Sequence, residues 1–169
     1  MSKLICENKY RVGGTKEDVI GLSVSLTDLP KEIQIQGNTL YLKDSFHVSL
    51  VCIGIIIQKY NILVPDFFNK VVNDFCDFAK INEIKILHYN NDFRFATEND
   101  LKSVVVMCEV SNINKFYDFI NEKYTLNIKY PSTHITLYTL KKQLGIFLTD
   151  EDDIKNLTVP IENPIGKNL

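Results

Sequence analysis

The chain has 169 residues, of which 45% are hydrophobic and 24% are charged, and its formal net charge is −2. This length supports one domain, or two small lobes, with a sizeable hydrophobic core. The slightly acidic charge argues against a protein that binds duplex DNA, since such proteins are usually basic. A nucleotide or the end of an RNA strand needs only a local polar or basic patch, so these partners remain open.

The four cysteines form no recognisable metal or redox motif. Cys6, Cys52, Cys76 and Cys108 contain no Cys-x-x-Cys pair and no zinc-binding spacing with histidine. Cys52 and Cys108 lie in apolar runs, as buried small hydrophobic residues do. The first residues lack the long apolar stretch of an export signal. We therefore expect reduced thiols, a cytoplasmic protein, and neither a metal nor another cofactor.

The longest apolar run covers residues 48–57 and is interrupted by Ser49 and Gly54. A membrane-spanning helix needs about 20 apolar residues, so this run is too short. We interpret it as a buried strand and expect no membrane partner. No heptad pattern demands an oligomer, so we expect a monomer.

The first part of the chain is polar and contains Gly13 and Gly14, which favour a turn or a loose arm in which Arg11 is solvated. Later stretches alternate apolar and polar side chains with the period of a strand. These stretches are residues 19–26, 33–36, 39–43, 45–51, 83–89, 93–96, 102–110 and 133–138. Gly37-Asn38 and residues 90–92 are expected to be turns between strands.

Two segments change to the helical period of three and four residues. Residues 61–80 carry an aromatic stripe with Pro65 suited to the first turn, and residues 111–124 carry a shorter apolar stripe capped by Ser111 or Asn112. We interpret both stripes as core packing. Residues 149–157 begin with acidic side chains, which favour a helix N-terminus over a metal site.

The order of strands and helices predicts an α+β protein. We treat residues 1–169 as one domain, with residues 1–17 and 158–169 as loose arms. The tail contains Pro160 and Pro164 and has no clear period.

Two of the predicted strands each place an imidazole and a hydroxyl on one face. His47 and Ser49 alternate with the apolar Phe46, Val48 and Leu50, so they lie on the opposite side of their strand. The chain has only three histidines, and a second one repeats the arrangement.

That second strand carries His134 and Thr136 on one face, with Ile135 and Leu137 on the other. Because the unperturbed pKa of histidine lies near neutrality, one imidazole can act as a base while the other acts as an acid. In-line attack on a phosphodiester needs both roles, and two hydroxyls can donate hydrogen bonds to the phosphate oxygens.

At His47-Val48-Ser49 and His134-Ile135-Thr136, the chain resembles the two-histidine (2H) phosphoesterases, whose signature is a pair of His-x-Ser/Thr motifs. The resemblance extends over residues 20–155, but only the two motifs are specific. It implies two pseudo-symmetric lobes, each an antiparallel sheet with an outer helix, around a central cleft. It also implies a metal-independent phosphodiesterase acting on 2′,3′-cyclic phosphates, 2′-5′ linkages or cyclic oligonucleotides.

The resemblance assigns His47 and His134 to acid/base catalysis and assigns Ser49 and Thr136 to phosphate binding. Two further residues are candidates for substrate binding from their places in the sequence. Tyr138 follows Thr136 by two residues, so it is expected on the same face, where it would stack on a base or contact phosphate unless it packs in the core. Arg94 is the only arginine in a regular element and would hold phosphate unless it faces solvent.

Two other functions remain open. A non-catalytic module would hold an RNA end or a nucleotide in the same cleft, although binding alone does not need both histidines. A metal protein would use His47 and His134 as ligands, but it would need a third ligand and would leave both hydroxyls without a role. We expect His88 to be structural, because no hydroxyl residue follows it at the second position. Lys141 and Lys142 are expected to be solvated or to add positive charge near the second motif.

Overall fold

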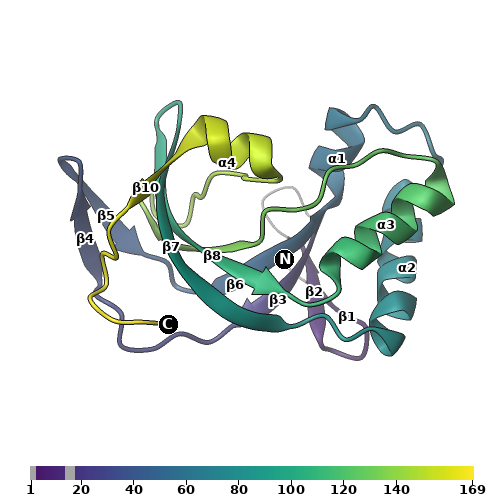
Figure 1. Ribbon diagram of the computed structural model, residues 1–169, viewed down its shortest axis with the longest axis horizontal. Helices are drawn as coiled ribbons and strands as arrows, with labels where there is room; N and C mark the ends of the chain where they lie inside the picture. The colour runs from purple at the N-terminus through teal and green to yellow at the C-terminus, as the bar shows by residue number, and fades with distance from the viewer. Residues whose placement is uncertain (1–2, 14–17) are drawn as a thin grey trace. The chain divides into compact units, whose positions relative to one another are not determined.

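The computed structural model describes residues 3–13 and 18–169, which form an α+β structure with an antiparallel sheet (Figure 1). The α+β class predicted from the sequence is therefore confirmed. The elements, in chain order, are β1 (Lys3–Ile5), β2 (Tyr10–Gly13), β3 (Val19–Val24), β4 (Glu32–Ile35), β5 (Asn38–Leu42), β6 (Phe46–Cys52), α1 (Ile53–Lys59), α2 (Phe67–Ile81), β7 (Ile86–Glu98), β8 (Leu101–Val110), α3 (Ile113–Tyr124), β9 (His134–Thr139), α4 (Glu151–Leu157) and β10 (Thr158–Ile161).

The chain divides into two units. The first contains Met1–Ser23, Ser49–Ile86 and Val110–Pro131, and the second contains Val24–Val48, Leu87–Glu109 and Ser132–Leu169. No helix within residues 3–13 and 18–169 is long and apolar enough to cross a membrane.

The first unit packs helices α2 and α3 against each other through aromatic side chains. The rings of Phe75 and Phe78 lie edge-on to Phe116, with centroids 5.2 and 5.4 Å apart. Such edge-to-face pairs add stability beyond the area that they bury. The two helices lie side by side in Figure 1. The aromatic stripes read from the sequence are thus core packing, as predicted.

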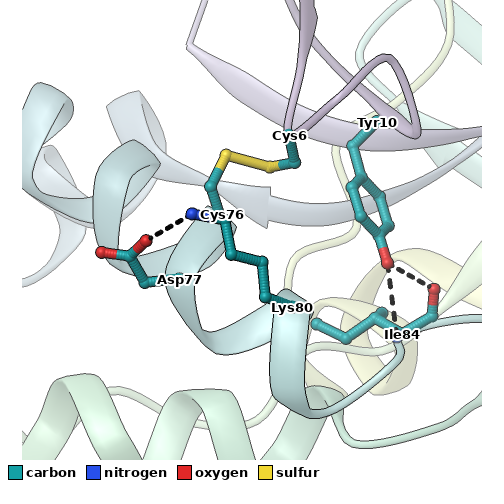
Figure 2. Close-up of a disulfide and its surroundings, with 6 residues drawn as sticks. All are labelled: Cys6, Tyr10, Cys76, Asp77, Lys80 and Ile84. Atoms are coloured by element: carbon teal, nitrogen blue, oxygen red, sulfur yellow. Dashed lines mark hydrogen bonds and ion pairs between the residues drawn. A yellow bond between two sulfur atoms is a disulfide. The ribbon is translucent and has the colours of Figure 1, made fainter.

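A disulfide in the first unit corrects the expectation of reduced thiols. Cys6, in the turn between β1 and β2, is bonded to Cys76 on α2, and their Cα atoms lie 4.9 Å apart (Figure 2). The hydroxyl of Tyr10, on the neighbouring strand, donates a hydrogen bond to the carbonyl of Ile84 just beyond the helix. The hairpin of β1 and β2 is therefore in contact with α2, although the two are far apart in the sequence. Cys52 and Cys108 are free and buried, as predicted.

Two further expectations for this unit were wrong. Residues 3–13 are not a loose arm, because β1 pairs with β2 and β2 pairs with β3; residues 14–17 lie outside the described residues. Arg11 is half-buried on β2, and this burial lowers its pKa. Residues 53–59 form helix α1 rather than the end of a buried strand. A continuous apolar run carries no period, so periodicity alone does not separate a strand from a helix.

The second unit is built around β9, which has β8 along one edge and both β6 and β5 along the other. β4 pairs with β5 through the turn at Gln36 and Gly37, one residue earlier than predicted, and both turn residues have positive φ. Helix α4 covers one face of this unit: Ile154 and Leu157 pack on a buried cluster of Ala96, Val105, Ile146 and Leu148.

Strands β7 and β10 correct two more details. β7 runs without interruption through residues 90–92, where a turn was expected, and Asn91 takes the left-handed conformation at φ 53° within the strand. Residues 158–161 are not a loose tail, since β10 pairs with β7. The acidic residues near 150 cap α4 as predicted: the side chain of Asp150 accepts hydrogen bonds from the backbone N–H groups of Asp152 and Asp153.

Candidate active site

The two histidine motifs meet at the pairing of β6 with β9. Val48 lies opposite Ile135 in an antiparallel register, and both side chains are fully buried. In this register the preceding residue on β6, His47, lies opposite Thr136, and both point to the other face of the sheet. The first imidazole is therefore beside the hydroxyl of the second motif.

His134 lies on the same face as Thr136, two residues earlier on β9. Residues diagonal to each other across an antiparallel pair have backbones about 7–8 Å apart. This relationship holds between His47 and His134, so both imidazoles lie on the same face of the sheet. His47, His134 and Thr136 all belong to the second unit.

Ser49 completes the first motif in sequence. It lies two residues beyond His47 on the same side of β6 and is partly buried. The boundary between the two units falls directly before it: Val48 belongs to the second unit, and Ser49 belongs to the first.

The protonation state of His134 is determined by its surroundings. Its Nδ1 lies 2.7 Å from the carbonyl oxygen of Ser132. A carbonyl can only accept a hydrogen bond, so Nδ1 carries the proton and, in the neutral ring, Nε2 has the lone pair. Burial lowers the pKa of His134, and the hydrogen bond to Ser132 opposes this shift only in part. The imidazole is therefore neutral near pH 7 and is suited to accept a proton through Nε2.

Thr136 is partly buried and is contacted by the loop that follows β9. A Cβ atom placed on Gly145 would lie 3.6 Å from Cγ2 and 3.7 Å from Oγ1 of Thr136. The backbone of this loop thus passes close to the threonine hydroxyl. The same loop is joined to the start of β6, because the side chain of Gln143 accepts a hydrogen bond from the backbone N–H of Asp44. Gly145 and Gln143 were not identified as site residues from the sequence, where nothing marks a loop as lying over a strand.

Tyr138 is not on the face of Thr136, contrary to expectation. Val104 pairs with Tyr138, but Val105 pairs with Thr136, so Leu137 is an extra residue that shifts the register of β9. Such a bulge reverses the alternation of side chains. Tyr138 is fully buried, and its hydroxyl donates a hydrogen bond to the carbonyl of Pro30 at 3.0 Å. The core-packing interpretation of Tyr138 is the one that the structure shows.

Arg94 forms contacts with two neighbouring polar side chains. Its Nε donates to the carboxylate of Asp92 at 3.3 Å and its Nη1 donates to the hydroxyl of Thr158 at 3.0 Å. Ala96, on the same side of β7, packs on Val105, which lies opposite Thr136. Strand β8, which carries Val105, therefore lies between the strand of Arg94 and that of Thr136.

The remaining charged candidates also have partners. Nε2 of His88 lies 3.3 Å from Oε2 of Glu109, and both side chains are exposed. Lys141 contacts Asp100, and Lys142 lies 4.0 Å from Asp44. Within residues 3–13 and 18–169, no group of three metal-binding side chains comes together.

The chain matches no family model, no curated protein and no solved structure.

Proposed function

We propose that this protein is a phosphodiesterase that uses His47 and His134 as an acid/base pair on a nucleotide or RNA phosphodiester. The observation that supports the proposal is the register of β6 against β9, which puts both histidines and Thr136 on one face of neighbouring strands. Packing of a hydrophobic core does not require two imidazoles and a hydroxyl on one face. Acid/base catalysis by paired proton transfer does require two such titratable groups.

His134 is the general base in this proposal. Its Nε2 lone pair takes a proton from the attacking water or hydroxyl, while the hydrogen bond from Nδ1 to Ser132 holds the ring in place and stabilises the imidazolium that forms. Burial keeps the ring neutral before the reaction, as a base requires.

His47 is then the general acid, which protonates the leaving oxygen. The hydroxyl of Thr136 donates a hydrogen bond to a non-bridging phosphate oxygen, where negative charge accumulates in the transition state. Ser49, in the first motif, has the same proposed role of donating a hydrogen bond to a phosphate oxygen. The substrates are 2′,3′-cyclic phosphates, 2′-5′ linkages or cyclic oligonucleotides, and the two lobes are pseudo-symmetric, as the motif resemblance implies.

The chemistry needs no metal ion, because the two imidazoles perform both proton transfers. A cytoplasmic location belongs to the proposal as well, and the Cys6–Cys76 disulfide weighs against it, since disulfides are rare in reducing compartments.

The test is to compare hydrolysis by the wild type and by His47→Ala, His134→Ala and His88→Ala variants. The first two should lose about 10²–10⁴ in rate. The third is a matched control, because His88 is an exposed histidine outside the motifs and should leave the rate unchanged. Full activity of His47→Ala would overturn the proposal. If the folded protein hydrolyses no substrate yet binds nucleotide, it is instead a binding module.

A further inference from the structure

The pairing of β5 with β9 brings an exposed aromatic side chain to the face of the histidines. Tyr41 lies opposite Thr139, and Thr139 lies opposite Ser103. Ser103 and Val105 are on the same side of β8, and Val105 lies opposite Thr136. Directly opposed residues point to the same face, so Tyr41 shares the face of Thr136.

Tyr41 also lies on the same edge of β9 as His47. β5 and β6 both pair with this edge, β5 beside Tyr138 and Thr139 and β6 beside Ile135. Thr139 lies three positions beyond Thr136, which is at most about 10 Å along a strand. A nucleotide covers such a span between its phosphate and its base.

The exposure of Tyr41 distinguishes it from most aromatic residues of the second unit. Its side chain is 47% exposed, whereas Phe93, Phe95 and Tyr138 are buried. Its ring therefore does not serve the core, although Leu40, its neighbour on β5, is fully buried. A single exposed tyrosine is common on protein surfaces, but this one adjoins the catalytic face.

We propose that Tyr41 is a stacking platform for the nucleobase of the substrate. The inference rests on the proposed function, which places the phosphate between His47 and His134, and it narrows the substrate to phosphodiesters that carry an aromatic base beside the reacting phosphate. Every base has a π-face, so the platform selects for a base without selecting which one. A tyrosine presents a large flat surface at a small cost in side-chain entropy.

The absence of tryptophan from the chain allows a direct test. A Tyr41→Trp variant has one indole, whose fluorescence should be quenched in a saturable manner by adenosine 2′-monophosphate and not by ribose 5-phosphate. Tyr130→Trp is the matched control, because Tyr130 is 48% exposed but belongs to the first unit. Its fluorescence should not respond. Absence of quenching in Tyr41→Trp, or equal quenching in both variants, would overturn the inference.

Kinetics provide the second measurement. For adenosine 2′,3′-cyclic phosphate, Tyr41→Ala should raise KM about 5- to 100-fold above that of the wild type. Tyr41→Phe should have the KM of the wild type, because the phenyl ring keeps the stacking surface. For the cyclic phosphate of methyl riboside, which has no base, Tyr41→Ala should leave KM unchanged. An equal rise in KM for both substrates would mean that Tyr41 acts through the fold and would contradict stacking.

The two proposals fail separately. If the histidine variants lose activity while the indole of the Tyr41→Trp variant is not quenched, the stacking platform is wrong and the phosphodiesterase stands. If that indole is quenched while the histidine variants retain full hydrolysis, the base is bound at position 41 but the catalytic assignment is wrong.

Discussion

Nδ1 of His134 lies 2.7 Å from the carbonyl oxygen of Ser132, two residues earlier in the chain. This contact determines the tautomer of the buried imidazole and, in the proposed mechanism, makes its Nε2 the base. The sequence motif alone leaves the roles of the two histidines undecided. In the proposed mechanism, the hydrogen bond and the burial of the ring make His134 the base.

The pH dependence of the reaction follows from this assignment. The base must be neutral, and burial lowers the pKa of His134 below its ordinary value of 6.5. We expect kcat/KM to follow a bell-shaped curve whose acidic limb has its midpoint below pH 6.5. Steady-state rates between about pH 4.5 and 9 check this. An acidic midpoint above 6.5 would show that His134 is not the base.

The same burial makes the stability of the fold depend on pH. In the unfolded chain the histidine binds a proton below pH 6.5, whereas in the fold it resists protonation until a lower pH. Between these two values the unfolded state holds more protons, so the free energy of unfolding falls as the pH falls. Urea unfolding at about pH 7.5 and about pH 5.5 should show a smaller loss for His134→Gln than for the wild type. An equal loss in both proteins would contradict the burial of a neutral imidazole.

The hydroxyl of Tyr138 should contribute to stability and not to catalysis. Tyr138→Phe removes the hydrogen bond to the carbonyl of the exposed Pro30, which costs about 0.5–1.5 kcal/mol. Denaturant unfolding measures this loss, and the kinetics should match the wild type at a temperature where both are folded. A large fall in kcat without a loss of stability would return Tyr138 to the active site.

Gly145 gives a graded test of the loop over Thr136. Gly145→Ala should be tolerated, because its Cβ would lie 3.6 Å from the threonine methyl, an ordinary contact distance. Gly145→Val adds two methyl groups beside that threonine and should lower kcat/KM at least about tenfold, since a small misplacement of a positioning group is costly. Thermal unfolding of both variants is the control, and equal kinetics for Ala and Val would place the loop outside the site.

The Cys6–Cys76 disulfide should stabilise the first unit. It closes a loop with a sequence separation of 70, for which chain entropy gives about 4 kcal/mol. Cys6→Ser with Cys76→Ser should lower the unfolding temperature, and a reducing agent should affect the wild type in the same direction but leave the variant unchanged. A wild type with all four thiols free by chemical titration would show that the bond does not form.

The elements with a strong period were predictable, and the features that depend on distant pairing were not. The aromatic period over residues 61–80 anticipates α2, and the alternation around Val48 and Ile135 anticipates the faces of His47 and His134. The bulge at Leu137 has no signal in the sequence. A sequence pattern assumes that side chains alternate regularly along a strand, and an extra residue becomes visible only in the pairing with the neighbouring strand. This is why Tyr138 was placed on the wrong face.

Contacts across the chain explain the other differences. Cys6 and Cys76 meet because a hairpin of the first residues lies on α2, and spacing cannot reveal such a pairing. The partners of Arg94, Asp92 and Thr158, also come from such contacts, and its part in substrate binding stays a prediction. Tyr41 was read only as part of an alternating strand. The proposed role of Tyr41 depends on the pairing of β5 and β6 with the same edge of β9.

The central claim is that paired histidines cleave a phosphodiester without a metal ion. Its most direct test is hydrolysis of 2′,3′-cyclic mononucleotides, 2′-5′ and 3′-5′ dinucleotides and cyclic oligonucleotides in excess chelator, by the wild type and by the His47→Ala/His134→Ala double variant. We predict chelator-resistant cleavage of at least one substrate class by the wild type and none by the folded double variant. Cleavage that disappears with chelator, or that survives in the double variant, would contradict the account.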